Sequence, residues 1–265
     1  MEKNIIFKQQ KALENTRSFI NKSDLKNPNL TGPIWQLLND ENIKININKK
    51  ESLELKNNWS RDLIGLLQRE LVNYQLYQMK LYNPPKLMDI IKSVFNKIES
   101  KKDKKHSILD IGCTSGYYYE IINFYHPNKF SYQGCDYNKG SIELAKQYYP
   151  NVNFFVDDLT NLSIDDNTYD ITFLSGVIEH IPLYIKGLNE LCRITKKYII
   201  LHRIWLKNGK TTCTKGTQYF VPIIRNHYNK NEFFSILKSK SFTPVWESEI
   251  YDNNCKTYLL KRIHQ

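Results

Sequence analysis

Two carboxylates and two glycines are spaced as in a binding site for an adenosine-containing ligand. An apolar stretch reaches Asp110 and is followed by Gly112 and Gly116, and a second acidic strand end, Asp136, comes one strand-helix-strand unit later. Glycines let a ligand approach the backbone closely. A carboxylate after the second strand can accept hydrogen bonds from both ribose hydroxyls. The spacing therefore predicts a ligand with an adenosine moiety.

Two common nucleotide sites do not fit this turn. A P-loop requires a lysine directly after its last glycine, and none follows Gly116. A dinucleotide site requires glycines at the third and sixth places counted from Gly112, which are occupied by Thr114 and Tyr117. ATP and NAD are therefore disfavoured, and S-adenosylmethionine, which carries adenosine without phosphate, is the candidate that remains.

Four segments, in order, resemble the motifs of class I S-adenosylmethionine-dependent methyltransferases. The run 108–116 resembles motif I, and Asp136-Tyr137 resembles the end of the second strand. Residues 154–159 resemble the third-strand motif of the family. Residues 169–181 resemble the fourth-strand motif, which ends in Glu-His. The resemblance covers roughly residues 105–203. One departure is Thr114, which stands where many members have a middle glycine.

The resemblance implies roles for the residues around the glycine turn. Gly112 and Gly116 would let the backbone approach the methionine and ribose part of the cofactor. Asp110 would face the cofactor's ammonium group; the alternative is a strand-end carboxylate that caps a local turn. Asp136 would accept hydrogen bonds from both ribose hydroxyls, and Tyr137 would pack on the adenine.

Further implied contacts lie after the third and fourth strands. Asp158 would accept a hydrogen bond from the adenine amino group, with the Leu159 backbone nearby. Asp157 is the alternative acceptor. Ser175 would lie at the end of the fourth strand, beside the transferable methyl group.

Three histidines are candidate general bases, because histidine titrates near neutral pH. His180 follows the fourth strand, His202 lies at the end of the fifth, and His227 lies in a later segment. Proton removal is needed if the acceptor is a hydroxyl. The alternative for His180 is that it only shapes the pocket. No metal site is expected, because the five cysteines show no CxxC spacing.

The sequence favours a small-molecule acceptor, methylated on oxygen or nitrogen, with a sugar or glycan precursor as one candidate. The fourth strand is followed by Leu174-Ser175-Gly176-Val177 instead of the Pro-Pro-aromatic motif of amino-methylating DNA enzymes, and no Pro-Cys nucleophile occurs. Two alternatives stay open. An RNA-modifying methyltransferase is supported by the net charge of +11, although no basic stripe or RNA-binding module is recognisable. The other is a non-catalytic, methyltransferase-like binding protein.

Composition indicates a globular protein of the cytoplasm. The chain has 265 residues, 41% of them hydrophobic, and its excess of lysine is scattered along the sequence. Cysteines without a regular spacing are typical of reduced thiols. No apolar run reaches the ~20 residues of a membrane-spanning helix.

The surrounding elements are expected to form an α/β, Rossmann-like doubly wound sheet with N-terminal helices. Residues 1–104 are interpreted as a helical extension packed on the core, with short helices over 1–58 and longer ones over 59–82 and from 86. Residues 105–265 would form seven mostly parallel strands that end in an antiparallel hairpin. Residues 204–228 are interpreted as an inserted irregular loop that forms the acceptor pocket or its lid, or else an ordinary surface crossover. The remaining expected elements are strands 107–111, 131–136, 152–156, 169–174, 197–203, 242–249 and 255–262, and helices 116–125, 139–149, 183–193 and 230–240, the last capped by Asn229.

Overall fold

A computed structural model describes residues 2–39, 45–81, 83–99, 105–251 and 255–263. Residues 252–254, which join the two strands of the expected C-terminal hairpin, lie outside the described residues. Within the described part of the chain, no helix is both long and apolar enough to cross a membrane.

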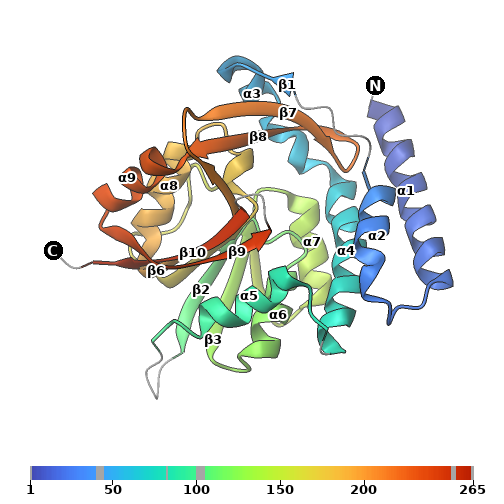
Figure 1. Cartoon of the computed structure of the whole chain (residues 1–265), viewed down its shortest axis with the longest axis horizontal. Coiled ribbons are helices and arrows are strands. Elements are labelled where there is room, and N and C mark those ends of the chain that lie inside the picture. The colour runs from blue at the N-terminus through green and yellow to red at the C-terminus, as the bar shows by residue number, and fades with distance from the viewer. Residues whose placement is uncertain (1, 40–44, 82, 100–104, 252–254, 264–265) are drawn as a thin grey trace.

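Five parallel strands form the centre of the sheet, in the order β4-β3-β2-β5-β6 (Figure 1). They are β2 (His106–Ile111), β3 (Phe130–Asp136), β4 (Asn153–Val156), β5 (Tyr169–Ser175) and β6 (Thr195–Lys207). The last strand, β10 (Cys255–Arg262), pairs antiparallel with β6, and β9 (Phe242–Tyr251) pairs antiparallel with β10. The expected mostly parallel sheet with an antiparallel C-terminal hairpin is therefore confirmed, but among the described residues the sheet has ten strands and not seven.

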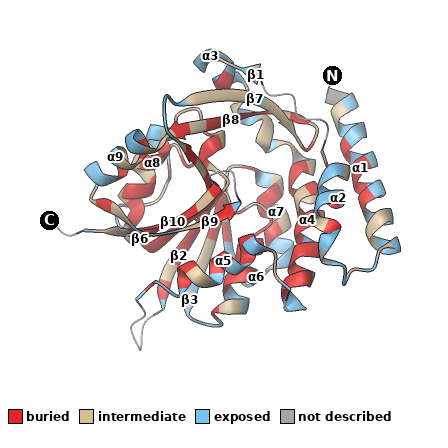
Figure 2. Cartoon of the chain, in the orientation of Figure 1, coloured by how far each residue is buried: buried red, intermediate tan, exposed pale blue. Residues whose placement is uncertain are grey.

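Alternate residues of the central strands enter two separate hydrophobic layers, one on each face of the sheet. Leu109, Leu174 and Leu201 belong to one buried cluster, whereas Ile108 and Phe173 belong to another. This alternation follows from the two-residue period of a strand. In Figure 2, buried residues appear both on strands of the sheet and on the helices that flank it. The helices that contribute to the two clusters are α8 (Tyr184–Ile194) and α9 (Lys230–Ser239) on one side, and α5 (Lys86–Phe95) and α6 (Tyr117–Tyr125) on the other.

The interpretation of 204–228 as an irregular loop is wrong. Strand β6 continues to Lys207, and β7 (Thr212–Gln218) and β8 (Val221–Asn229) form an antiparallel hairpin that extends the sheet. The turn consists of Tyr219 and Phe220, with φ of 49° and 64°. Asn-Gly or Asp-Gly is usual where both turn residues have positive φ. The sequence signal was absent because the turn is made of two aromatic residues.

The N-terminal helices pack against this hairpin. They are α1 (Glu2–Lys22), η1 (Pro28–Leu30), α2 (Thr31–Leu37), α3 (Lys49–Glu54), η2 (Lys56–Ser60) and α4 (Asp62–Lys80), and β1 (Ile45–Asn46) pairs with β7. The first helix has 21 residues, so short helices throughout 1–58 were a wrong expectation. One hydrophobic cluster joins Leu13, Ile34 and Leu67 to Val221 and Ile223 of β8.

Two side chains from the N-terminal helices fix the tip of the hairpin. Gln9 Nε2 donates to the Tyr219 carbonyl at 2.9 Å, and Asn39 Oδ1 accepts from the Tyr219 N–H at 2.7 Å. Backbone in a sparsely populated conformation persists only where its surroundings hold it. The strained turn is thus kept in place by helices distant in the sequence.

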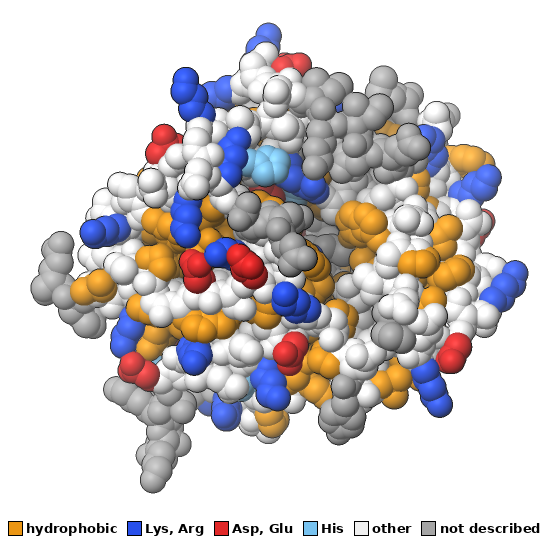
Figure 3. All heavy atoms as spheres, viewed as in Figure 1, with side chains coloured by type: hydrophobic (Ala, Val, Ile, Leu, Met, Phe, Trp, Pro, Cys, Tyr) orange, Lys and Arg blue, Asp and Glu red, His pale blue; other side chains and the backbone are white. Residues whose placement is uncertain are grey.

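Lysine and arginine side chains are scattered over the face shown in Figure 3 and do not form a continuous stripe. The helix expected over 230–240 is also confirmed, since Asn229 caps α9 by accepting a hydrogen bond from the Glu232 N–H.

Candidate active site

A cavity of about 470 Å³ lies at the carboxyl ends of the parallel strands. Ligands bind at this edge in open α/β sheets. The turns after β2, β3, β4 and β5 line the cavity. Residues of α2, η2, α4 and the β7–β8 hairpin line it too. The cavity is thus bounded both by the strand ends and by the N-terminal helices with the hairpin.

Gly112 lines the cavity with φ of 74°, a conformation that side chains other than glycine rarely adopt. A Cβ at this position would lie 2.4 Å from Val177 Cγ2, so the turn has no room for a side chain. Gly116 also has positive φ and precedes α6, but it packs against Phe154 and does not line the cavity.

Thr114 adopts φ of 49°, which explains why glycine suits this place in the motif. Its N–H donates to Asp136 Oδ2 at 3.0 Å. Its Oγ1 is buried and has no hydrogen-bond partner among the described residues. The threonine therefore keeps the shape of the turn at the expense of backbone strain.

Asp136 lines the cavity at the end of β3. Its Oδ2 accepts from Thr114 and its Oδ1 accepts from the Asn138 N–H at 2.9 Å. Burial raises the pKa of Asp136 to about 6, against the backbone hydrogen bonds that favour its ionised form. Each carboxylate oxygen has two lone pairs, so both can still accept from a ligand.

Asp110 does not line the cavity. It is buried within β2, where it accepts a hydrogen bond from the Tyr132 hydroxyl. Burial raises the pKa of Asp110 to about 7. The contact between Asp110 and the cofactor's ammonium group therefore stays a prediction. A direct contact would require the Asp110 side chain to reach the cavity.

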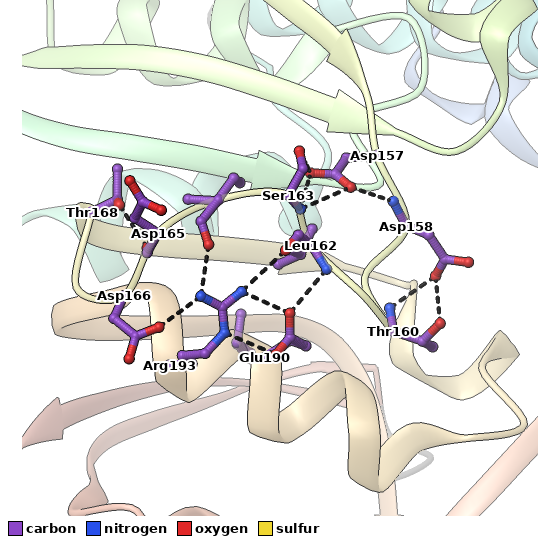
Figure 4. Close-up of polar contacts among 12 residues, drawn as sticks. Asp157, Asp158, Thr160, Leu162, Ser163, Asp165, Asp166, Thr168, Glu190 and Arg193 are labelled. Atoms are coloured by element: carbon purple, nitrogen blue, oxygen red, sulfur yellow. Dashed lines mark hydrogen bonds and ion pairs between the residues drawn. The ribbon is translucent and has the colours of Figure 1, made fainter.

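Asp158 lines the cavity after β4, but both of its oxygens are engaged. Oδ1 accepts from Thr160, as Figure 4 shows, and Oδ2 is ion-paired with Lys56 Nζ at 2.8 Å. Burial alone would raise the pKa of Asp158. The hydrogen bonds from Lys56 and Thr160 and the charge of Lys56 together outweigh burial, so the pKa of Asp158 is lowered. An adenine amino group would have to share or replace these partners.

The neighbouring Asp157 supports the same loop. It accepts from the Ser163 N–H and hydroxyl, each at 3.0 Å, and Arg193 of α8 binds the loop further along, at the Ile164 carbonyl and Asp166 (Figure 4). Leu159, between these anchors, lines the cavity. The loop that carries Asp158 is therefore fixed from both sides.

Residues 56–60, which form η2, make a strap across the cavity. Asn58 Nδ2 donates to the Pro222 carbonyl of β8 at 2.7 Å, and Asn138 Nδ2 donates to the Trp59 carbonyl at 2.8 Å. Tyr137, which also lines the cavity, donates from its hydroxyl to the Lys56 carbonyl at 3.3 Å. The strap thus joins the hairpin to the turn after β3.

His180 is the one candidate base of the three that lines the cavity. Its Nδ1 lies 2.6 Å from the Ile224 carbonyl oxygen, which can only accept, so Nδ1 carries the proton and Nε2 is an acceptor. The Trp59 ring lies 4.7 Å from the imidazole. Burial, and then the charge of Arg225, lower the pKa of His180 to about 3, so it is neutral at physiological pH.

The other two histidines lie away from the cavity lining. His202 is buried in β6, with Nδ1 2.7 Å from Thr257 Oγ1, and His227 lies in β8 opposite Thr212. Ser175 does line the cavity; its Oγ lies 2.6 Å from the Tyr118 hydroxyl and accepts from Arg203 Nε at 3.1 Å.

Several lining residues were not assigned a role from the sequence. They include Trp59 and Arg203. Glu179 was recognised only as part of the Glu-His motif, whereas Tyr219 and Arg225 lie in 204–228, the segment expected to form the acceptor pocket or its lid, and both do line the cavity. Trp59 and Tyr219 reach the site through the packing of the N-terminal helices on the hairpin. Among the described residues, no group of three or more His, Cys, Asp or Glu is placed to hold a metal ion.

Comparison with known proteins gives a consistent class. Residues 108–198 match the family model described as a methyltransferase domain. Two solved structures share the fold. One is a SAM-dependent methyltransferase from Methanosarcina mazei (TM-score 0.52, 16% identity, 65% of this chain and 98% of that chain). The other is 1,6-didemethyltoxoflavin-N1-methyltransferase from Burkholderia thailandensis (TM-score 0.54, 11% identity, 84% and 96%).

Residues 108–198, about a third of the chain, therefore resemble a methyltransferase domain, and the two solved structures share the Rossmann-like fold of this chain. Among curated proteins, the ubiquinone/menaquinone biosynthesis C-methyltransferase of Campylobacter jejuni is 32% identical over 140 residues, 51% of this chain and 56% of that protein. The demethylmenaquinone methyltransferase of Paenarthrobacter aurescens is 27% identical over 96 residues, 36% and 34%. The chain thus spans about a third to a half of the length of these two relatives.

Proposed function

We propose that this protein transfers a methyl group from S-adenosylmethionine to a small molecule bound in the same cavity. The observation that carries the proposal is the glycine turn at Gly112, which has no room for a side chain and lines the same cavity as the Asp136 carboxylate. The cofactor supplies the methyl group on a sulfonium. The protein's task is then to align an acceptor with it and to exclude water.

The proposed roles follow from position. Asp136 holds the ribose, Tyr137 packs on the adenine, and Ser175 and Gly176, which line the cavity, lie beside the transferable methyl group. The strap 56–60 screens the site from solvent. His180 Nε2, an unprotonated acceptor, receives a hydrogen bond from the acceptor molecule and orients it.

The acceptor is proposed to be small because the strap and the hairpin both line the cavity. An oxygen or nitrogen atom, as on a sugar precursor, is one candidate. A carbon atom is another, supported by the relative whose name describes it as a C-methyltransferase. The scattered lysines and arginines of the face shown in Figure 3 do not favour a nucleic acid.

A methylation screen tests the proposal. The protein is incubated with S-adenosylmethionine and a pool of metabolites, and S-adenosylhomocysteine formation is followed together with new masses 14 units above a pool member, the approximate gain on adding a methyl group. We expect turnover in fractions below about 1 kDa. Turnover only with RNA would contradict the small-molecule acceptor. Cofactor binding with no turnover in any fraction would favour the non-catalytic alternative.

A further inference from the structure

We call the acceptor half the part of the cavity around His180, Trp59 and Tyr219, where the acceptor is proposed to bind. Two arginines and one carboxylate, Arg203, Arg225 and Glu179, line the same cavity. Among the residues that the structure describes, neither arginine has an ion pair within 4 Å, although Glu179 acts on the pKa of both. The positive charge of these three side chains therefore exceeds their negative charge.

Arg203 is positioned by an irregularity in β6. It has φ of 57°, and the pairing of β6 with β10 shifts its register between Lys256 and Tyr258. Bulges of this kind redirect a side chain, and strained backbone is concentrated at functional sites. The guanidinium lies against Gly176, where a Cβ would be 2.7 Å from Nη2. Arg203 is thus held next to the end of β5.

Arg225 lies on β8, and one of its buried hydrogen-bond donors lacks a partner among the described residues. Its Nη2 donates to Gln218 Oε1 at 3.2 Å, whereas its Nε is buried and has no hydrogen-bond partner among the described residues. A buried donor without a partner is unfavourable. Burial and the charge of Arg203 lower the pKa of Arg225, against the effect of Glu179. An anionic ligand would relieve both the unmet donor and the repulsion between the guanidiniums.

Glu179 compensates this charge incompletely. It is 3% exposed, and its Oε2 has no hydrogen-bond partner among the described residues. Burial raises the pKa of Glu179 to about 7 even though Arg203 and Arg225 act to lower it. At neutral pH the carboxyl group is therefore partly protonated.

We propose that the acceptor carries an anionic oxyacid group, which Arg225 binds within the positive potential of Arg203, and an apolar body that packs against Trp59 and Tyr219. The planar fork of arginine suits a carboxylate or a phosphate, and aromatic side chains suit a flat apolar body. This inference rests on the proposed function, because it concerns the acceptor of the same reaction.

Binding of an anion would also change His180. After burial, the charges of Arg225 and Arg203 hold the pKa of His180 low. An anion that neutralises these charges would raise that pKa, and an imidazole of higher pKa is a better proton acceptor near neutral pH. Binding of the anionic acceptor would thus make His180 a stronger proton acceptor near neutral pH.

Calorimetry on the protein saturated with S-adenosylhomocysteine tests the inference without turnover. The probes are benzoate, phenyl phosphate and the neutral benzamide. We expect at least one anion to bind about tenfold or more tightly than benzamide. A preference for benzoate would assign a carboxylate, and a preference for phenyl phosphate would assign a phosphate. If neither anion binds more tightly than benzamide, the inference is overturned.

Variants locate the binding group. Arg225→Gln should weaken the preferred anion about tenfold or more, and Arg225→Lys, which keeps the charge without the fork, should weaken it less. The control variant Arg17→Gln also removes one positive charge, from a pair with Glu70 in which Arg17 is exposed, and it should leave binding of the preferred anion unchanged. Anion binding that is equal in wild type and Arg225→Gln would overturn the assignment. The protein is first titrated with S-adenosylhomocysteine. If the proposed function fails, that compound does not bind, so this failure is distinguished from a wrong assignment of Arg225.

Discussion

Lys56 Nζ lies 2.8 Å from Asp158 Oδ2, so a lysine of the strap is ion-paired with the carboxylate expected to meet the adenine. The pair joins an N-terminal segment to the loop after β4. We propose that cofactor binding and strap position are coupled, because an adenine amino group bound by Asp158 would compete with Lys56 for the same carboxylate.

Breaking this pair should speed cofactor exchange. In Lys56→Met we expect the association and dissociation rate constants for S-adenosylmethionine to rise severalfold, because one anchor of the strap is lost. The pair is partly exposed, so stability should fall by no more than about 1 kcal/mol. Stopped-flow fluorescence measures the rates. Lys139→Met, which removes an exposed pair with Glu143 on α7 (Lys139–Tyr148), is the matched control. Unchanged rates in Lys56→Met would show that the strap does not limit access.

Loss of the carboxylate at the end of β3 should weaken cofactor binding. Asp136→Ala removes an ionised acceptor, and hydrogen bonds to charged groups are worth roughly 1.5–3 kcal/mol, so affinity should fall about tenfold or more. Calorimetry on the folded variant gives the affinity. Glu99→Ala, which removes an exposed carboxylate paired with Lys261 outside the cavity lining, should leave it unchanged. Equal affinities in wild type and Asp136→Ala would remove Asp136 from the ribose site.

Thr114→Gly should stabilise the protein. A β-branched residue at φ of 49° is strained, and its hydroxyl is buried without a partner among the described residues. We expect a gain of about 1 kcal/mol in the free energy of unfolding, measured in urea. Thr114→Ala removes the hydroxyl but keeps a Cβ, so its gain should be smaller. A destabilised glycine variant would mean that threonine contacts outweigh the strain.

Stability should decline between pH 6.5 and 8. Burial raises the pKa values of Asp110 and Glu179 to about 7 and of Asp136 to about 6, above their ordinary values of 3.8, 4.5 and 3.8. The folded state binds more protons than the unfolded state in this window, so stability is lost as pH rises through 7. Burial lowers the pKa of His180 from 6.5 to about 3 and that of His202 well below 6.5, so both act oppositely below pH 6.5 and should make the decline shallower there.

Urea unfolding at a series of pH values measures this dependence. Asp110→Asn keeps the shape of the side chain and its acceptor for Tyr132 but removes one titrating group. The slope above pH 6.5 should therefore be shallower in this variant. Stability that rises with pH between 6.5 and 8 would contradict the raised pKa values.

The central sheet could be predicted from sequence, whereas for the acceptor half only the segment 204–228 could be named, and its conformation could not. Strands such as 107–111 and 169–174 are short apolar runs, and their glycine and acidic ends are local signals. The hairpin at Tyr219 lacks a turn signal, and its strands contain Gly216 and Pro222, which are depleted in strands. Trp59 and Arg225 are distant in sequence and meet only through tertiary packing. Candidate bases could be named by type, but their burial depended on neighbours that the sequence does not reveal.

The cofactor site itself is tested most directly by calorimetry of the wild-type protein with S-adenosylmethionine and S-adenosylhomocysteine. We expect one molecule of either compound to bind per chain, and this binding to be lost or weakened at least tenfold in Asp136→Ala. No binding of either compound by the folded wild-type protein would contradict a methyl-donor site at the Gly112 turn.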